Sequence, residues 1–351
     1  MTLIVPRLGA MTFKKAGIAG AGSWGTALGM LLLENRLPVT LWGHEPRHVD
    51  ALLRDRENAA YLPGIPLPGT LDLSSELRAI ADADLLLLVT PSMAIREVAA
   101  RLSTAGVREH TVLLSCTKGV ERGSGLRMSE IVAGFFPRNP IAVLSGPSHA
   151  EEVARGMPTA VVLGCGDTGL AERLQQAFST PCFRAYTSDD VPGVEFGGAL
   201  KNIFAIAAGV SDGLGLGDNS KAALVTRALR ELIGLGTALG GKRETFQGLS
   251  GLGDLMVTCF SRHSRNRLVG QRLGAGERLA DITASMRMIA EGVPTTYSAT
   301  ECARRLGIDT PIIDQMRDLL DGTISAREAM ANLLGREPKA ESPTAFPLFR
   351  V

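Results

Sequence analysis

A glycine pattern near the N-terminus constrains the fold of this chain more than any other feature. Residues 16–28 read AGIAGAGSWGTAL, so Gly20, Gly22 and Gly25 form G-x-G-x-x-G between a short apolar strand and a helix. The first glycine permits a tight turn, the second lets the backbone approach a pyrophosphate, and the third allows the helix to pack closely on the strand. The N–H groups at the start of that helix would face the phosphates. The pattern predicts a dinucleotide site, although 40 glycines leave a purely structural turn as the alternative.

The first half of the chain alternates short apolar runs with helical patterns, which is typical of a parallel sheet covered by helices. The run LLLLV at 85–89 is the continuous apolar type expected of a strand buried on both faces. Strands are predicted at 15–19, 39–42, 85–89, 112–116, 142–144, 160–163 and 183–186. Helices are predicted at 26–35, 92–102, 125–133, 150–155 and 170–178.

After about residue 191 the strand pattern ends and the apolar periodicity becomes helical. Helices are predicted at 194–210, 221–239, 267–273, 296–306, 312–320 and 326–334. We therefore expect an α/β Rossmann-type N-terminal domain over 12–190 and an all-α C-terminal domain over 191–336, followed by a loosely ordered tail over 337–351. Two domains also suit the length, because a single core rarely extends over 351 residues.

The composition argues against several kinds of partner. A formal net charge of +1 gives no overall attraction to nucleic acid or anionic membranes, so any anion site has to be local. No apolar run approaches the roughly 18 residues of a membrane span, and the first ten residues lack the apolar core of a signal peptide. Five scattered cysteines without a CxxC pair are typical of reduced thiols. We expect a cytoplasmic protein without an integral membrane segment, starting at Met1 or Met11.

The end of the second predicted strand bears on the choice between NAD and NADP. An Asp or Glu about 20 residues after the glycines normally binds the ribose 2′-OH. Here the segment reads LWGHEPRH, with His44 directly beyond the strand and Arg47 close behind. Both are compatible with a 2′-phosphate, which a carboxylate would repel, so NADPH is favoured over NADH; Glu45 could still reach the ribose. His44 and His48 are spaced i,i+4, but no third ligand is evident and no metal site is predicted.

Two segments at strand ends are suited to binding a small anion. Lys118 of CTKG follows a predicted strand, where ligands bind in open α/β sheets; a solvated surface lysine is the alternative. In SGPSHAE at 145–151, Ser148 and Glu151 fit a helix capping box. The same geometry would expose backbone N–H groups to an oxyanion, so the structural and functional interpretations are compatible.

The helical half contains a lysine in apolar surroundings. GGALKN at 197–202 places Lys201 and Asn202 in an otherwise apolar helix, and burying an unpaired ammonium is costly. Asp254 of GLGDLMVT is the candidate partner, with Thr258 on the same face if that segment is helical. A purely structural Lys–Asp pair is the alternative.

A third anion-binding segment reads SRHSRNR at 261–267. Ser264 is predicted as an N-cap, which places Arg265 and Asn266 in the first turn of a helix. Arginine there opposes the helix dipole unless an anion is bound, and a guanidinium binds phosphate through two parallel hydrogen bonds. A solvated helix start is the alternative.

Taken in order, the motifs GAGSWGTAL, LLLLVTPS, CTKG, SGPSHAEE, FGGALKN, GLGDLMVTC, SRNR and AEG resemble those of bacterial NAD(P)-dependent glycerol-3-phosphate dehydrogenases. The resemblance covers residues 16–336 and implies a 6-phosphogluconate-dehydrogenase-like fold with the active site between the domains. It implies reversible reduction of dihydroxyacetone phosphate to sn-glycerol 3-phosphate by NAD(P)H, supplying phospholipid synthesis, and is compatible with a homodimer. One departure is His149, where the family more usually has an aromatic residue.

The fingerprint and the resemblance together imply roles for individual residues. Lys201 would be the proton donor or acceptor, with Asp254 beside it. Cofactor contacts would come from Gly20, Gly22, Ser23, Trp24, Gly25, His44, Lys118, Ala150, Arg265, Ile289 and Glu291. Substrate contacts would come from Lys118, Gly146, Ser148, Lys201, Asp254, Thr258, Ser264, Arg265 and Asn266.

Two other functions stay open at this level. A related two-domain dehydrogenase of 3-hydroxy acids or ketopantoate would act on a carboxylate that lacks a phosphate. A non-catalytic sensor of NAD(P)H would need no proton donor, and the presence of both Lys201 and Asp254 argues against it.

Overall fold

The structure is a computed structural model that describes residues 13–337, 340 and 341. Met1 and Met11, the two expected starts, lie outside the described residues. Most of the tail predicted over 337–351 lies outside them as well, so its loose order stays a prediction.

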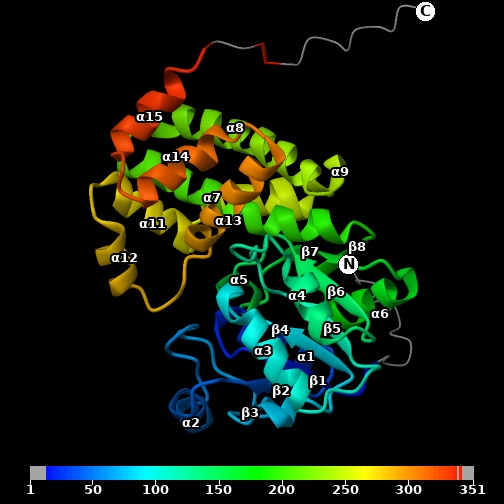
Figure 1. Ribbon diagram of the computed structural model, residues 1–351. Coiled ribbons are helices and arrows are strands. Elements are labelled where there is room, and N and C mark those ends of the chain that lie inside the picture. Colours follow the sequence, from blue (N-terminus) through cyan, green and yellow to red (C-terminus); the bar gives the residue numbers. More distant parts are fainter. Residues whose placement is uncertain (1–12, 338–339, 342–351) are drawn as a thin grey trace, which may run out of the picture.

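The first half of the chain forms one eight-stranded sheet in the order β3-β2-β1-β4-β5-β6-β7-β8 (Figure 1). All the predicted strands are present, with ends that differ from the prediction by two residues or fewer. The additional strand, β3, was not predicted because it is a short, partly exposed edge strand without an apolar run. The strands are β1 (Ala16–Ala19), β2 (Val39–Trp42), β3 (Asp72–Ser74), β4 (Leu85–Leu88), β5 (Val112–Ser115), β6 (Ile141–Ser145), β7 (Thr159–Gly164) and β8 (Phe183–Ser188).

The sheet is parallel except where β6 pairs with β7, which is antiparallel. The parallel sheet expected from the sequence is therefore wrong at this one pairing. A parallel connection needs a crossover segment long enough to return along the sheet. Between β6 and β7 the only helix is α5 (Ala150–Val153), which has four residues and is too short to make that return.

Helices cover both faces of the sheet, and β4 shows how its sequence produces this arrangement. Leu85 and Leu87 belong to the core under α1 and α6, whereas Leu86 and Leu88 belong to the core under α3 and α4. Because successive strand residues point to opposite faces, a run of leucines serves both cores. The helix α2 was not predicted, since only half of its sequence PRHVDALLRD is apolar and only Val49 and Leu52 are buried. The longer helices of this half are α1 (Ser23–Glu34), α2 (Pro46–Asp55), α3 (Ile95–Thr104), α4 (Met128–Phe135) and α6 (Thr168–Phe178).

In the described chain after β8, every regular element is helical. The long helix α7 (Val191–Gly213) lies at the centre and is buried along almost its whole length, as expected of a helix that is apolar on all sides. Short helices such as α9, α10 and α12 were not predicted, because they contain too few residues for the helical periodicity of apolar positions to be recognised. Around α7 lie α8 (Gly217–Ala238), α9 (Arg243–Phe246), a π-helical turn (Leu249–Gly253), α10 (Asp254–Phe260), α11 (Arg265–Gly274), α12 (Leu279–Ser285), α13 (Gly292–Leu306), α14 (Pro311–Leu320) and α15 (Ala326–Leu334). No helix within the described ranges is long and apolar enough to span a membrane.

Glycines bring the backbones of α7 and α11 into direct contact. A Cβ atom added to Gly270 would lie 1.9 Å from the carbonyl oxygen of Ile206, and one added to Gly209 would lie 2.0 Å from that of Arg267. No side chain can fit between the helices at these points. The relative position of α7 and α11 is therefore fixed by main-chain atoms.

We expect Gly270→Ala to destabilise the protein by about 1–3 kcal/mol, the usual cost of overpacking a close contact. The contact is with backbone oxygen, which cannot rotate away, so the helices have to separate. Gly234→Ala is the matched control, because Gly234 is also within a helix of this half but has open space around it. Denaturant unfolding measures both free energies. Equal stability of the two variants would show that the helix pair tolerates separation.

Candidate active site

The three fingerprint glycines each meet a different steric demand. Gly20 has a φ of +129°, and a Cβ atom there would lie 2.4 Å from the carbonyl oxygen of Val89. A Cβ atom on Gly25 would lie 1.9 Å from the carbonyl oxygen of Gly20, so the turn and the first helix can pack only without one. Gly22, in contrast, has open space around its Cα. These are the demands of a tight turn, a helix packed on a strand, and a backbone that a ligand can approach.

Two buried polar atoms near the carboxyl ends of the strands support a cofactor at this edge. The Nε1 atom of Trp24, in the first turn of α1, and the Oγ1 atom of Thr90, just beyond β4, have no hydrogen-bond partner among residues 13–337, 340 and 341. Buried polar groups are rarely left unpaired in native proteins. The open space at Gly22 and these two atoms fit a dinucleotide. Thr90 was not predicted, although its place at the end of the apolar run LLLLV was a usable signal.

The residues after β2 lie where the ribose of a dinucleotide is expected. His44, Glu45 and Arg47 are all exposed there, at the start of α2. His48 does not point to a shared site with His44, because its Nε2 atom lies 3.3 Å from the carbonyl oxygen of Ala21. His44 is therefore the histidine of this segment that is available to a cofactor.

A buried carboxylate joins the two halves of the chain by binding two lysines. Asp254, the first residue of α10, contacts Lys201 Nζ with Oδ1 at 2.9 Å and Lys118 Nζ with Oδ2 at 2.5 Å. Lys201 also donates to Thr258 Oγ1 at 2.7 Å, and Thr258 lies one turn from Asp254 on the same helix face. The partner and the shared face expected from the sequence are both present. The second lysine was not expected on this carboxylate.

The electrostatics of this cluster favour proton transfer near neutral pH. Burial lowers the pKa of the Lys201 ammonium to about 8, with the charge of Lys118 acting in the same direction and Asp254 opposing both. Burial alone would raise the pKa of the Asp254 carboxyl, but the two lysines outweigh burial and hold that pKa below its usual range. Asp254 therefore stays ionised while Lys201 can gain or lose a proton, which is what a general acid–base group requires.

The loop after β6 lies against the same cluster. The carbonyl oxygen of Gly146, a residue with a φ of +136°, accepts hydrogen bonds from Lys118 Nζ and Ser148 Oγ, both at 2.9 Å. The predicted capping box of Ser148 and Glu151 is wrong. The helix α5 begins at Ala150, one residue later than that box requires, and the Ser148 hydroxyl is bound to Gly146 instead.

The start of α11 has the local structure that the sequence predicts. Ser264 is the N-cap residue, and its hydroxyl accepts a hydrogen bond from the Arg267 backbone N–H at 3.1 Å. Arg265 is exposed and donates from Nη1 to the carbonyl oxygen of Ile289 at 3.2 Å. Burial nevertheless lowers the pKa of its guanidinium, which the charges of Glu151 and Glu291 oppose. The guanidinium lies at the helix end where an anion would bind.

Asn266 is buried and connects three helices. Its amide donates to Asn202 Oδ1 and accepts from the Gly292 backbone N–H, both at 2.8 Å. Asn202 follows Lys201 on α7, so the segment around α11 is held beside the lysine. Asn202 was noted in the sequence but given no role, because its partner is distant in the chain.

The segment before α13 reaches across to the sheet. Glu291 accepts hydrogen bonds from the backbone N–H of Ser92 at 2.9 Å and from its hydroxyl at 2.5 Å. Burial raises the pKa of the Glu291 carboxyl, which these hydrogen bonds oppose. Ile289, two residues earlier, is 44% exposed. Ser92 was not predicted as part of the site, since nothing local in the sequence links it to Glu291.

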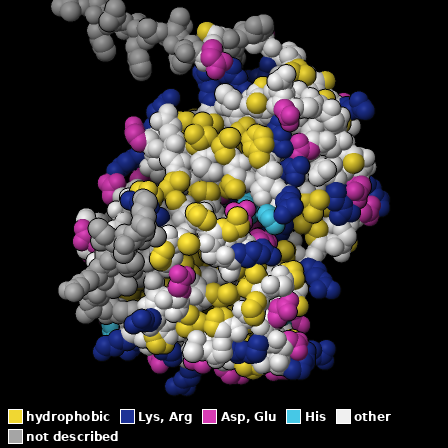
Figure 2. Space-filling view, turned by 180° about the vertical axis from the view of Figure 1, so that it is seen from behind, with side chains coloured by type: hydrophobic (Ala, Val, Ile, Leu, Met, Phe, Trp, Pro, Cys, Tyr) yellow, Lys and Arg dark blue, Asp and Glu magenta, His cyan; other side chains and the backbone are white. Residues whose placement is uncertain are grey.

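The expected site residues thus form three adjoining groups. Seen from behind, Lys and Arg, Asp and Glu, and His side chains lie close together at middle height, between the helical half and the sheet (Figure 2). The lysine–carboxylate group holds Lys118, Gly146, Ser148, Lys201, Asp254 and Thr258. The α11 group holds Ser264, Arg265 and Asn266 with Ile289 and Glu291. The fingerprint group holds Gly20, Gly22, Ser23, Trp24 and Gly25, with His44 beyond the neighbouring strand and Ala150 buried at the start of α5.

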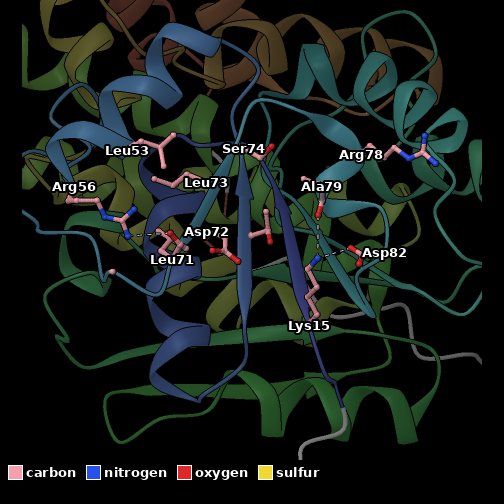
Figure 3. Close-up of a pocket in the computed structure, with 12 residues that line it drawn as sticks. Lys15, Leu53, Arg56, Leu71, Asp72, Leu73, Ser74, Arg78, Ala79 and Asp82 are labelled. Carbon is pink, nitrogen blue, oxygen red and sulfur yellow. Dashed lines mark hydrogen bonds and ion pairs between the residues drawn. The ribbon is translucent and has the colours of Figure 1, made fainter.

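A separate cavity of about 580 Å³ lies near the amino ends of β1, β2 and β3 (Figure 3). Two of its cationic side chains are already bound: Lys15 pairs with Asp82 at 2.7 Å, and Arg56 donates to the carbonyl oxygen of Leu71 at 3.3 Å. None of the expected site residues lines it. The cavity is lined by Lys15, Thr40, Leu53, Arg56, Gly69, Leu71, Asp72, Leu73, Ser74, Arg78, Ala79 and Asp82.

Comparison with known proteins agrees with this geometry. Residues 15–171 match the family model of the NAD-dependent glycerol-3-phosphate dehydrogenase N-terminus, and residues 190–331 match that of its C-terminus. Proteins named glycerol-3-phosphate dehydrogenase (NAD(P)+) from Chlorobium phaeobacteroides and Geobacter sulfurreducens are 45% and 46% identical, each alignment covering 93% of this chain and 99% of the relative.

Solved structures show the same relationship. The crystal structure of glycerol-3-phosphate dehydrogenase from Coxiella burnetii is similar with a TM-score of 0.89 and 40% identity, covering 92% of this chain and 99% of that one. A ketopantoate reductase from Ralstonia eutropha has a TM-score of 0.61 at 18% identity over 90% of this chain and 99% of that one. The latter resemblance concerns the fold alone.

Proposed function

The chain belongs to the NAD-dependent glycerol-3-phosphate dehydrogenase family, and on that premise we propose that it interconverts dihydroxyacetone phosphate and sn-glycerol 3-phosphate with NAD(P)H. The observation that supports this most directly is the buried Lys201–Asp254–Lys118 cluster, which lies between a dinucleotide fingerprint and a helix start bearing an exposed arginine. Together these features meet the three needs of the reaction: a hydride donor site, a proton donor and a phosphate site.

In the proposed mechanism Lys201 transfers the proton. Bound NAD(P)H supplies the hydride that adds to the ketone carbon of the substrate. The Lys201 ammonium donates a proton to the developing alkoxide oxygen and becomes a neutral amine; in the oxidation direction the neutral amine takes that proton back. Asp254 holds the ammonium in place and remains ionised because Lys118 binds its second oxygen. The charge of Lys118 also lowers the pKa of the Lys201 ammonium directly.

The phosphate of the substrate is proposed to bind Ser264, Arg265 and Asn266 at the start of α11. Binding energy from this distant group would then orient the carbonyl at Lys201. Gly146 and Ser148 are proposed as further substrate ligands, with Lys118 contacting both substrate and cofactor. The remaining proposed cofactor ligands are Gly20, Gly22, Ser23, Trp24, Gly25, His44, Ala150, Arg265, Ile289 and Glu291.

The proposal has further parts that rest on the apolar patterning, the composition and the family resemblance. They are a dinucleotide-binding domain over 12–190 with a helical substrate domain over 191–336, a cytoplasmic location, a homodimer, and a supply of glycerol 3-phosphate for phospholipid synthesis. Light scattering of the purified protein tests the homodimer directly.

An absorbance assay of NAD(P)H oxidation tests the reaction. We expect turnover with dihydroxyacetone phosphate and none with ketopantoate or 3-oxo acids, which carry a carboxylate in place of the phosphate. Turnover of the carboxylates alone would assign the chain to a related dehydrogenase. Binding of NAD(P)H without turnover of any of these substrates would support a sensor instead.

We expect NADPH to be at least as good a cofactor as NADH, because exposed His44 and Arg47 lie where a 2′-phosphate would bind. His44→Asp should shift the ratio of the two kcat/KM values toward NADH by at least about tenfold, or about 1.4 kcal/mol, since a carboxylate repels the 2′-phosphate. His110→Asp, also exposed but in the loop before β5, is the control and should leave the ratio unchanged. A strong preference of the unaltered protein for NADH would contradict this assignment.

A further inference from the structure

His149 brings two site segments together. It is the residue before α5, in the loop that binds Lys118 through Gly146, and it is half-buried. Its ring lies beside that of His263, with the ring centroids 5.8 Å apart and the planes tilted by 51°. His263 directly precedes Ser264, the N-cap of α11. The His149 ring therefore lies between the loop after β6 and the proposed phosphate site.

The Nε2 atom of His149 is buried and has no hydrogen-bond partner among the residues that the structure describes. An imidazole nitrogen either donates or accepts a hydrogen bond, and a buried polar atom without a partner costs free energy. Such atoms are rare in native proteins and call for an explanation. One explanation is a bound ligand that supplies the missing hydrogen-bond partner.

The charges around the ring show which part of the molecule it faces. Burial lowers the pKa of His149 below its usual range, and the next largest influence is the Lys201 ammonium, which lowers it further. Asp254 and Glu151 oppose this shift, and Lys118 adds to it. The ring is therefore neutral at neutral pH and lies within the field of the lysine–carboxylate group. It is close to both the proposed proton donor and the proposed phosphate ligands.

We propose that His149 is a substrate ligand whose Nε2–H donates a hydrogen bond to the phosphate of dihydroxyacetone phosphate. The phosphate dianion has only acceptor oxygens, so the imidazole has to donate, and a hydrogen bond to an anion is among the stronger kinds. This inference rests on the proposed function and adds a specificity-determining residue to it. A phenyl ring at this position would have no donor and would not make this bond.

His149→Phe tests the proposal, because phenylalanine retains a ring of similar size beside His263 but removes the donor. We expect the KM for dihydroxyacetone phosphate to rise about 10- to 100-fold, as for loss of a hydrogen bond to a charged group. The kcat should change less than about threefold, and the Kd of NADPH, measured by fluorescence titration, should stay the same. His149→Gln, which retains an N–H donor, should recover part of the loss. His263→Phe retains the neighbouring ring and is the control, with an expected KM close to that of the unaltered protein.

Two measurements show whether the phosphate is the group that His149 contacts. The variant His149→Phe should also weaken inhibition by inorganic phosphate, whereas its kcat/KM for unphosphorylated dihydroxyacetone should barely change. Equal losses for the two substrates, or a KM within twofold of the unaltered protein, would overturn the inference. So would a parallel loss of NADPH affinity in both His149 variants, which would indicate a structural role. If the unaltered protein did not reduce dihydroxyacetone phosphate, the proposed function itself would fail. If it did, and His149→Phe had the same KM for that substrate, only the inference about His149 would fail.

Discussion

Replacing Lys201 with methionine is expected to lower kcat for dihydroxyacetone phosphate by roughly 10²–10⁴-fold, the usual contribution of a general acid. Methionine is unbranched and apolar, so it can occupy the buried site of Lys201 without a proton to give. The fold should persist because Asp254 keeps Lys118 as a counter-ion and is not left as an unpaired buried charge. Steady-state kinetics measure the loss, and circular dichroism with an NADPH titration tests the fold and the cofactor site. A near-normal kcat would make Lys201 a structural residue.

The pH dependence tests the same assignment in the unaltered enzyme. With a Lys201 pKa of about 8, reduction needs the protonated form, so its rate should be highest below this pH and fall above it. Oxidation needs the neutral amine, so its rate should rise through the same pH range. Lys201→Met should lose this inflection in the residual activity of both directions. A reduction rate that rose with pH through this range would contradict the role of Lys201 as the acid.

Arg265→Ala is expected to lower kcat/KM for dihydroxyacetone phosphate by roughly 30-fold to several thousand-fold. The range follows from about 2–5 kcal/mol for removing one partner of a hydrogen-bonded charge pair, at about 1.4 kcal/mol per tenfold change. Arg265→Lys should recover little, because an ammonium cannot reproduce the two parallel hydrogen bonds of a guanidinium. Kinetics with the phosphorylated substrate measure the effect.

The control for Arg265 compares two substrates and two arginines. The kcat/KM for unphosphorylated dihydroxyacetone should fall far less, since that substrate has no phosphate to contact Arg265. Arg262→Ala removes an exposed arginine three residues earlier and should have little effect. NADPH affinity has to be measured separately, because Arg265 also binds the carbonyl of Ile289 in the segment proposed to contact the cofactor. Equal proportional losses for both substrates would show that Arg265 does not recognise the phosphate.

The sequence predicted those parts of the fold that depend on apolar patterning. The run at 85–89 identified β4 because a strand buried on both faces has no polar residue to interrupt it. The strand β3 and the helix α2 were missed, since a short edge strand and a surface helix with only two buried residues bury little apolar area. The antiparallel pairing of β6 with β7 was missed because the direction of pairing depends on the crossover and not on the strand residues themselves.

The site residues could be predicted from the sequence where a charged residue lies in an otherwise apolar segment. Lys201 in an apolar helix required a buried partner, and Asp254 in the apolar segment GLGDLMVT was its candidate partner. The contacts of Lys118 with Asp254 and of Ser92 with Glu291 could not be found in this way, because they join residues separated by 136 and 199 positions. Contacts at such separations follow from how the two halves pack, and no local pattern encodes them.

The direct contact between α7 and α11 also bears on which molecules can be substrates. The two helices carry the proposed proton donor and the proposed phosphate ligands, and their backbones touch where Gly209 and Gly270 leave no room for a side chain. No change of rotamer can lengthen or shorten the distance between the two helices. We therefore expect substrates to be distinguished by the number of atoms between their carbonyl and their phosphate. A homologue with one additional methylene would carry both correct end groups, yet its carbonyl would lie on the order of 1 Å from the productive position. A misplacement of that size can cost on the order of 10²-fold in rate, so we expect substrate length to be selected by main-chain geometry as well as by charge.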